Sequence, residues 1–295
     1  MRVDVHTHMW SDATVPAFLR DYAAGRGPDS SIESGANALL RSMDACGIDA
    51  SVAVALIPEP YPSESSVEEI NKYVRDQVTG HADRLAGFCA INPRSHRAAD
   101  DLRRHLDSWA CGLKLHGAMQ ELRVDSETLY PIYEVMSAYQ RPVLFHSGDI
   151  GVLPIKDHFT RASLFDAIAC DFPRMPMILG HAGRIDWATV AGLLRKHPNV
   201  YADISSVIGR DASTQTRPLR NLLEAVKEWA GSLDHILFGS DAPLYSQAAT
   251  QENIDQLLDE LPGSGSILTE AEVRAVRDSN SGDFTTLHHI FTSQE

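Results

Sequence analysis

The sequence contains no run of lysine or arginine, and its acidic residues outnumber its basic ones. There are 40 Asp and Glu residues against 26 Lys and Arg, which gives a formal net charge of −14 over 295 residues. An acidic surface repels phosphate backbones and anionic membranes. We therefore expect a small-molecule substrate and no nucleic-acid or membrane partner.

Long apolar runs and paired cysteines are also missing. No apolar stretch approaches the roughly 20 residues that a membrane helix needs, and residues 1–8 turn polar too early for a signal peptide. The four cysteines lie far apart and form no CxxC pair, which is typical of reduced thiols. We expect a cytoplasmic protein, and the sequence leaves open whether it is a homo-oligomer.

Repeats, low-complexity tracts and linkers are absent as well, and short apolar runs alternate with longer helical patterns. This alternation predicts βα units and a parallel sheet. The expected strands are Arg2–Val5, Ala50–Leu56, Leu85–Ile91, Gly112–Leu115, Pro142–Phe145, Met177–Leu179, Val200–Ile204 and His235–Phe238. The expected helices are about 32–46, 65–79, 96–108, 127–140, 161–171, 185–196, 216–230 and a last region within 250–277.

Eight strands that are each followed by a helix predict a (β/α)₈ TIM barrel, which typically takes about 250 residues. We expect one such domain over residues 1–295. The rival is an open doubly wound sheet, but no Gly-rich phosphate loop follows the first strand. Residues from about 9 to 31 contain two prolines and two glycines around a short apolar piece, which predicts an elaborated first βα loop.

Side chains that bind metal or move protons recur where the predicted strands end. They are His6 and His8 at the first strand, Lys114 and His116 at the fourth, His146 at the fifth, His181 at the sixth and Asp241 after the eighth. Barrel enzymes build their active sites at the carboxyl ends of the strands. The positions therefore predict one site that is shared by these residues.

The alternation of side chains along a strand supports this prediction. A period of two places His6 and His8 on one face and the valines of the same strand on the other. In residues 112–116 the leucines would face the helices, which leaves Lys114 and His116 facing inward. Imidazole and carboxylate ligands with an open position suit a catalytic ion. We expect one divalent ion, zinc in the first place, with manganese and iron as alternatives.

Five blocks of sequence, DVHTHMW, GLKLHG, VLFHSGD, LGHAG and LFGSDAP, resemble the amidohydrolase superfamily. The likeness is strongest to its amidohydrolase-related branch, which also contains aminocarboxymuconate-semialdehyde decarboxylase-like enzymes, and it spans Val3 to about Asn280. The resemblance is specific for the superfamily but not for the substrate. It implies four metal ligands, which are His6, His8, His146 and Asp241. It also implies that His181 contacts the activated water or the substrate oxygen.

Lys114 has three open interpretations. It is a barrel lysine paired with a carboxylate such as Asp4, a substrate-binding residue, or a carboxylated lysine that bridges two ions. The last role is the one that the resemblance implies for two-metal members. The KLH pattern with its following glycine looks more like the one-metal branch, so we expect Lys114 to be unmodified.

Other polar and aromatic residues have less specific interpretations. Trp10 lies two residues after His8 and is a candidate substrate-binding pocket wall. Arg184 lies three residues past His181 and either binds a substrate carboxylate or forms a surface ion pair. His96, His105 and His197 lie on helical or loop stretches, and we expect them to be solvated.

The resemblance and the residues together favour a metal-dependent hydrolase of an amide, a lactone or another cyclic or acyl substrate. A bound ion lowers the pKa of its water from about 15.7 towards 7. Asp241 would accept the proton of that water and His181 would polarise the oxygen that becomes anionic. Both are therefore the expected catalytic residues.

Two alternatives remain beside the hydrolase. One is a non-oxidative decarboxylase or hydratase of an unsaturated or aromatic carboxylic acid, because the same branch contains such enzymes. The KLH pattern favours the hydrolase, since decarboxylase-like members typically lack it. The other alternative is a catalytically inactive barrel that serves as a binding protein, but such a barrel would usually have lost a ligand, and none is lost here.

Overall fold

A computed structural model describes residues 1–15, 34–151, 153–209 and 212–291. Its centre is one eight-stranded sheet in the order β1 to β8, in which every neighbouring pair is parallel. The strands are β1 Val3–His8, β2 Ala50–Val54, β3 Leu85–Cys89, β4 Gly112–Leu115, β5 Val143–His146, β6 Met177–Gly180, β7 Val200–Asp203 and β8 Ile236–Leu237. A parallel bridge between Thr7 and Ala242 joins the end of the sheet back to β1. The sheet is therefore a (β/α)₈ TIM barrel, as the sequence predicts.

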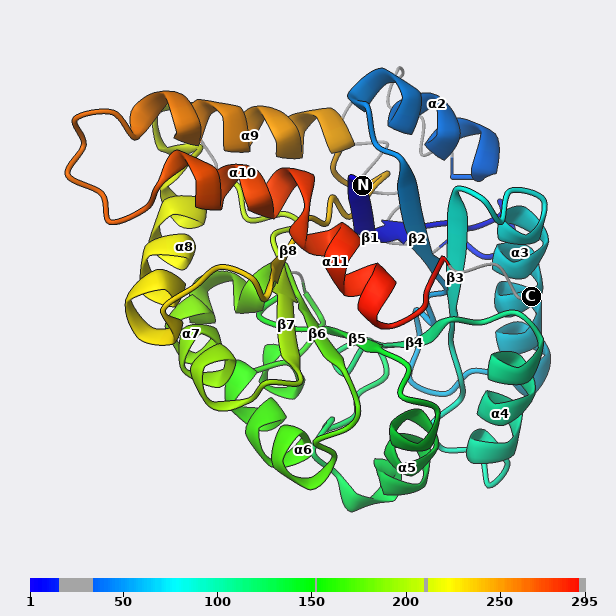
Figure 1. The fold of residues 1–295 in the computed structure, drawn as a ribbon. Helices are drawn as coiled ribbons and strands as arrows, with labels where there is room; N and C mark the ends of the chain where they lie inside the picture. The colour runs from blue at the N-terminus through cyan, green and yellow to red at the C-terminus, as the bar shows by residue number, and fades with distance from the viewer. Residues whose placement is uncertain (16–33, 152, 210–211, 292–295) are drawn as a thin grey trace.

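Helices surround the strands, and one of them, α11 (Asn280–Leu287), lies across an end of the barrel (Figure 1). They are α2 Ala36–Cys46, α3 Glu64–Thr79, α4 Ala98–Ser108, α5 Tyr130–Tyr139, α6 Phe165–Asp171, α7 Trp187–Lys196, α8 Arg217–Ala230, α9 Gln247–Glu260, α10 Glu270–Asp278 and α11 Asn280–Leu287. Short 3₁₀ turns occur at η1 Glu127–Leu129, η2 Asp157–Phe159, η3 Ala162–Leu164, η4 His181–Asp186 and η5 Ala212–Thr214. None of the described helices combines the length and the apolar composition needed to cross a bilayer.

Most of the predicted first loop, about 9–31, lies outside the described residues, because the structure describes nothing from 16 to 33. The helix predicted from about residue 32 begins at Ala36 in the structure. It ends at Gly47, whose φ of 64° is the left-handed conformation that glycine adopts most readily. The assignment of residues 1–295 to one domain stays a prediction.

The layer between strands and helices is built by the periodicity that the sequence shows. In α8 the buried residues are Leu219, Leu222, Leu223 and Val226, which follow the three-and-four spacing of one helix face. From the strands, Leu113 and Leu115 enter the same apolar layer, so the lysine between them points into the barrel. The inward orientation of Lys114 therefore agrees with the predicted alternation.

Strand β1 contains a β-bulge that the sequence analysis did not anticipate. Its pairing with β2 advances from Asp4 to Thr7 while β2 advances only from residue 51 to residue 53. Below the bulge, Val5 packs inside the barrel with Leu144 and other residues of that phase. Above it, His6 also points inward. The prediction that the valines and the histidines occupy opposite faces is therefore wrong, because the extra residue shifts the side-chain phase.

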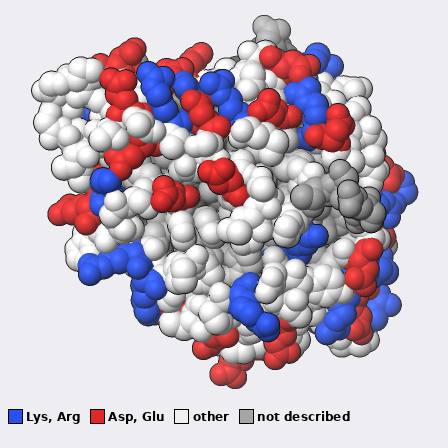
Figure 2. Space-filling model, viewed as in Figure 1, with Lys and Arg blue, Asp and Glu red and all other residues white. Residues whose placement is uncertain are grey.

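Helix α11 covers the amino-terminal end of the barrel (Figure 1), beyond the last helical region that the sequence predicted. Phe284 is 3% exposed and packs edge-on against Tyr201 of β7, with ring centroids 4.7 Å apart. The Asn280 side chain donates to the carbonyl oxygens of Leu233 and Ile236 at 2.8 and 3.0 Å. On the face that Figure 2 shows, acidic and basic side chains are interspersed. The opposite end of the barrel is the one that carries the polar cluster.

Candidate active site

Three predicted ligands meet at the carboxyl ends of β1 and β8. His8 Nε2 lies 3.0 Å from Asp241 Oδ1, and His6 Nε2 lies 3.8 Å from the same oxygen. One donor atom from each of the three residues falls within 4.8 Å of the others. The backbone N–H of Asp241 donates to the His6 carbonyl oxygen at 2.8 Å, which fixes the loop after β8 against β1. This donor spacing suits a single cation.

His146 and His181 form a second part of the cluster, together with His116. His181 Nε2 lies 3.1 Å from His146 Nδ1, and the His116 ring stacks on the His146 ring with centroids 4.0 Å apart. His146 therefore lies outside the tight group of the three predicted ligands. Its Nε2 atom is nevertheless buried and without a hydrogen-bond partner in the part of the chain that the structure describes. A buried lone pair of this kind is available to a metal ion.

Burial lowers the pKa of every histidine in this cluster below its ordinary value. The five are His6, His8, His116, His146 and His181, and the pKa of His181 falls to about 3. The neutral imidazole is the form that binds metal. Burial alone would raise the pKa of the Asp241 carboxyl, but the His8 hydrogen bond and the neighbouring histidines hold it below its ordinary value. The site is therefore prepared to hold a cation.

Lys114 points into this cluster rather than toward Asp4. Its Nζ lies 3.1 Å from His6 Nε2, and burial lowers the pKa of the Lys114 ammonium to about 8. Asp4 instead accepts hydrogen bonds from the side chains of Ser240 and Gln247 at 2.6 and 2.8 Å. The proposed pairing with Asp4 was wrong, because the β1 bulge leaves Asp4 facing α9. The unmodified state of Lys114 stays a prediction.

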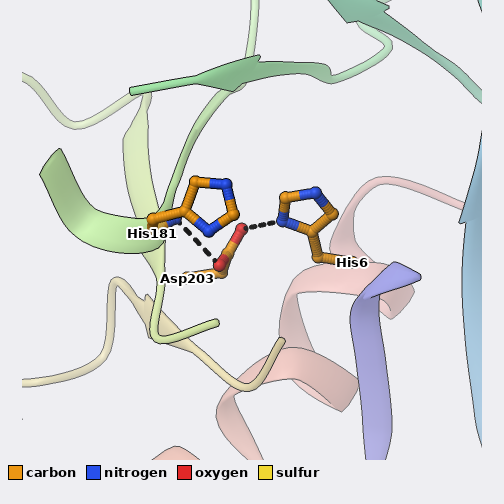
Figure 3. Close-up of side chains that lie close together, drawn as sticks. All are labelled: His6, His181 and Asp203. Carbon is orange, nitrogen blue, oxygen red and sulfur yellow. Dashed lines mark hydrogen bonds and ion pairs between the residues drawn. The ribbon is translucent and has the colours of Figure 1, made fainter. Parts of the chain in front are cut away.

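Asp203, at the end of β7, is a residue of the cluster that the sequence analysis missed. Its side chain is fully buried, and its Oδ2 lies 2.9 Å from His6 Nδ1. Its Oδ1 accepts the backbone N–H of His181 at 3.1 Å (Figure 3). Asp203 lies within the predicted strand Val200–Ile204. The strand-end rule that selected the other residues would therefore have found it.

Trp10 forms a wall beside the predicted ligands. It is 6% exposed, and its ring stacks on the His8 ring with centroids 5.7 Å apart. Its backbone carbonyl accepts a hydrogen bond from Ser34 at 2.6 Å, which anchors the start of the first loop. A neighbouring pocket of about 180 Å³ is lined by His8, Ser34, Gly35, Ala38, Leu39, Ser42, Ala242, Pro243 and Ser246. Small side chains thus surround His8 on its outer side.

Arg184 lies on a turn with an unusual backbone. Four consecutive residues have positive φ, from 62° at His181 through 43° and 70° to 51° at Arg184, where ψ is −110°. Non-glycine residues in such conformations cost about 1–3 kcal/mol each and cluster at functional sites. Gly148 makes room for this turn, because a Cβ atom there would lie 2.4 Å from the carbonyl oxygen of Gly183. The loops after β5 and β6 are therefore packed backbone to backbone.

The guanidinium of Arg184 acts on the histidine cluster. Its charge is among the causes that lower the pKa of His146 and His181, although burial is the largest cause for both. Its Nε is buried and has no hydrogen-bond partner within the described ranges. A second pocket, of about 570 Å³, lies along the same loops and is lined by Gly148, Asp149, Gly151, Asp157, Arg161, Ile185 and Asp186. Arg184 therefore has a buried donor without a partner among the described residues, and its charge acts on His146 and His181.

Comparison with known proteins gives a family and a set of related folds. A family model described as Amidohydrolase matches residues 3–284. No curated protein matches the chain. Among solved structures, a TIM-barrel protein from Bordetella bronchiseptica has a TM-score of 0.73 at 15% identity, with 97% of this chain and 98% of that chain covered.

Two decarboxylases are also similar in structure. The 2,6-dihydroxybenzoate decarboxylase from Rhizobium has a TM-score of 0.66 at 17% identity, with 97% of this chain and 98% of that chain covered. The dihydroxybenzoic acid decarboxylase from Polaromonas sp. JS666 was solved with bound manganese and the inhibitor 2-nitroresorcinol. It has a TM-score of 0.70 at 17% identity, with 99% of this chain and 98% of that chain covered. At these identities the likeness establishes the shared barrel fold.

Proposed function

Because the chain belongs to the amidohydrolase family, we propose that it is a metal-dependent enzyme that removes carbon dioxide from a small unsaturated or aromatic carboxylic acid. The observation that carries this proposal is Arg184, a cation with an unsatisfied buried donor beside the histidine cluster. A guanidinium binds carboxylates through parallel N–H donors. The decarboxylases of related fold support the same choice.

We propose His6, His8 and Asp241 as the residues that would hold the metal ion, with His146 Nε2 as a further ligand. Neutral buried imidazoles, one carboxylate and a buried lone pair without a partner among the described residues fit a divalent cation. A bound ion would supply Lewis acidity to the oxygen atoms of the substrate. Imidazole and carboxylate suit both zinc and manganese. The manganese of the Polaromonas enzyme supports including manganese beside the zinc that the sequence favours.

The residues of the chain have simple tasks in this reaction. The bond between the carboxylate carbon and its neighbour breaks, the electron pair stays on the substrate, and a proton from water replaces the carbon dioxide that leaves. No oxidant or reductant is needed. Arg184 would bind the carboxylate before it leaves, and Trp10 would supply a flat apolar wall for the ring. His181 Nδ1 faces the Ser205 carbonyl oxygen at 3.2 Å and its Nε2 lies 3.1 Å from His146 Nδ1, so His181 would contact a substrate oxygen only after Nε2 leaves His146.

Hydrolysis of an amide, a lactone or another acyl substrate is the second candidate. The observation that favours it is the protonation of the cluster, since Asp241 has a lowered pKa and the histidines are neutral at neutral pH. An ionised Asp241 next to His8 can accept a proton from a water molecule. Lys114, the residue of the KLH pattern, also points into the site.

The test combines metal analysis with a substrate panel. The purified chain is reconstituted with Mn²⁺ or Zn²⁺, and elemental analysis should return one ion per chain. Hydroxybenzoates and muconate-like acids are then compared with lactones and amides, with carbon dioxide release and hydrolysis measured separately. Carbon dioxide release from an acid supports the proposal. Hydrolysis without carbon dioxide release favours the second candidate, and a chain that binds no ion in either form contradicts both.

A further inference from the structure

The carboxylate of Asp203 joins two residues of the candidate site from behind. Figure 3 shows it between His6 and His181, with one oxygen directed at each. Oδ1 accepts the backbone N–H groups of His181 and Ser205 at 3.1 and 2.9 Å, and it also accepts the Ser205 hydroxyl. Oδ2 is left to face His6 Nδ1 at 2.9 Å. All of these groups are buried, so water does not compete for them.

A donor on one side of His6 and an acceptor on the other determine which of its nitrogens carries the proton. Lys114 Nζ lies 3.1 Å from His6 Nε2, and an ammonium group is only a donor, so Nε2 must present its lone pair. The proton of the neutral ring is therefore on Nδ1, where Asp203 Oδ2 accepts it. The Nε2 lone pair is the one that faces Asp241 and His8. The orientation and the tautomer of His6 follow from the same pair of contacts.

We propose that Asp203 is a positioning residue that holds His6 in the Nδ1–H tautomer and so presents Nε2 to the metal. The same carboxylate contacts both His6 Nδ1 and the backbone N–H of His181, which is the first residue of the strained turn that ends at Arg184. The alternative, a second cation bound between His6, His181 and Asp203, conflicts with the hydrogen bonds. Oδ1 already accepts three donors, and Oδ2 accepts the fourth. The consequence for metal affinity rests on the proposed function, whereas the tautomer does not.

Asp203→Asn keeps the contacts of Asp203 with the backbone of His181 and removes its acceptor for His6 Nδ1. The amide has one oxygen and one NH₂ group, and three donors converge on the Oδ1 position, so the amide oxygen takes that side. The NH₂ group then faces His6 Nδ1 as a donor while Lys114 Nζ still faces Nε2, so the Nδ1–H tautomer loses the acceptor that favoured it. The Nε2–H form becomes populated, and that form cannot bind a metal through Nε2. Replacement of such a partner of a metal-binding histidine typically weakens metal binding by about 10–100-fold.

Asp4→Asn is the matched control, because Asp4 is equally buried and lies on the same strand as His6. The variant is compatible with its surroundings. Gln247 Oε1 has no hydrogen-bond partner within the described part of the chain and can accept from the new amide after a flip of the Gln247 side chain. The Ser240 hydroxyl can turn to accept as well. Neither change reaches the His6 ring.

The decisive measurement is nitrogen NMR of ¹⁵N-histidine-labelled protein without metal, with the His6 signals identified by their loss in His6→Gln. We expect Nδ1–H in the wild type and in Asp4→Asn, and a populated Nε2–H form in Asp203→Asn. Competition with a chromophoric chelator should show weaker binding of Mn²⁺ and Zn²⁺ in Asp203→Asn only. Nε2–H in the wild type, or Nδ1–H as the sole form in a folded Asp203→Asn, overturns the inference. A tautomer change in a protein that binds no metal refutes the proposed function and leaves the role of Asp203 standing.

Discussion

Arg184→Gln removes the positive charge beside the histidine cluster while it keeps a polar side chain of moderate length. The charge lies close enough to lower the pKa of His146 and His181, and the buried Nε has no competing hydrogen-bond partner among the described residues. A hydrogen bond to a charged group contributes about 1.5–3 kcal/mol. Since about 1.4 kcal/mol corresponds to tenfold, binding of a carboxylate should weaken by roughly 10–150-fold.

The assay compares the affinity of one carboxylic acid with that of its primary amide, both measured as inhibitors or ligands of the metal-loaded protein. Arg184→Gln should weaken binding of the acid by roughly 10–150-fold and change binding of the amide little, because only the acid forms the ion pair. Arg195→Gln is the control, since Arg195 lies on α7 over the ring of Trp229, with its guanidinium carbon 5.5 Å from the ring centroid. Equal weakening of acid and amide, or an equal effect of the control, would refute the reasoning.

Three further predictions concern stability, pH and metal binding. Phe284→Ala should lower the free energy of unfolding by about 3–5 kcal/mol in denaturant titrations, whereas Leu287→Ala, which is 64% exposed, should change it by less than about 0.5 kcal/mol; similar losses would contradict the packing of α11. Burial raises the pKa of Asp4 to about 6 from 3.8, so the folded state holds a proton that the unfolded state has released, and stability should fall by up to about 3 kcal/mol as pH rises from about 4 to 6. This dependence of stability on pH should be absent in Asp4→Asn. An unchanged dependence in the variant would contradict the raised pKa of Asp4. His6→Ala should lose both metal and turnover, whereas His181→Ala should keep the metal and lose turnover; loss of metal from both would make His181 a direct ligand.

The barrel could be predicted from the sequence because hydrophobic periodicity reports element type directly. Each of the eight predicted strands overlaps an observed one, and most predicted helices agree within a few residues. The exact strand ends were less accurate. Strand β1 extends to His8 rather than Val5. Strand β8 is only Ile236–Leu237, and the barrel closes between β8 and β1 through single backbone hydrogen bonds that follow it. Local pattern does not record such contacts between distant segments.

The site was predictable to the extent that each residue lies at the end of a strand. The burial of His105 and His197 was not, and the expectation that they are solvated was wrong. His105 is 3% exposed and accepts a hydrogen bond from Trp109, and His197 is 5% exposed and lies 2.7 Å from Asp166. Their burial depends on tertiary neighbours. The position of His146 outside the tight ligand group likewise depends on how the side chains pack at the rim.

The bulge in β1 gives the two halves of one short strand different side-chain phases. Residues before it, such as Val3 and Val5, fill the floor of the barrel, and His6 and His8 after it point to the same interior at the rim. In a strand of the same sequence without the bulge, strict alternation would place both imidazoles on the face opposite Val3 and Val5. Position along the chain is therefore a poor guide to equivalence with a relative whose first strand has no bulge.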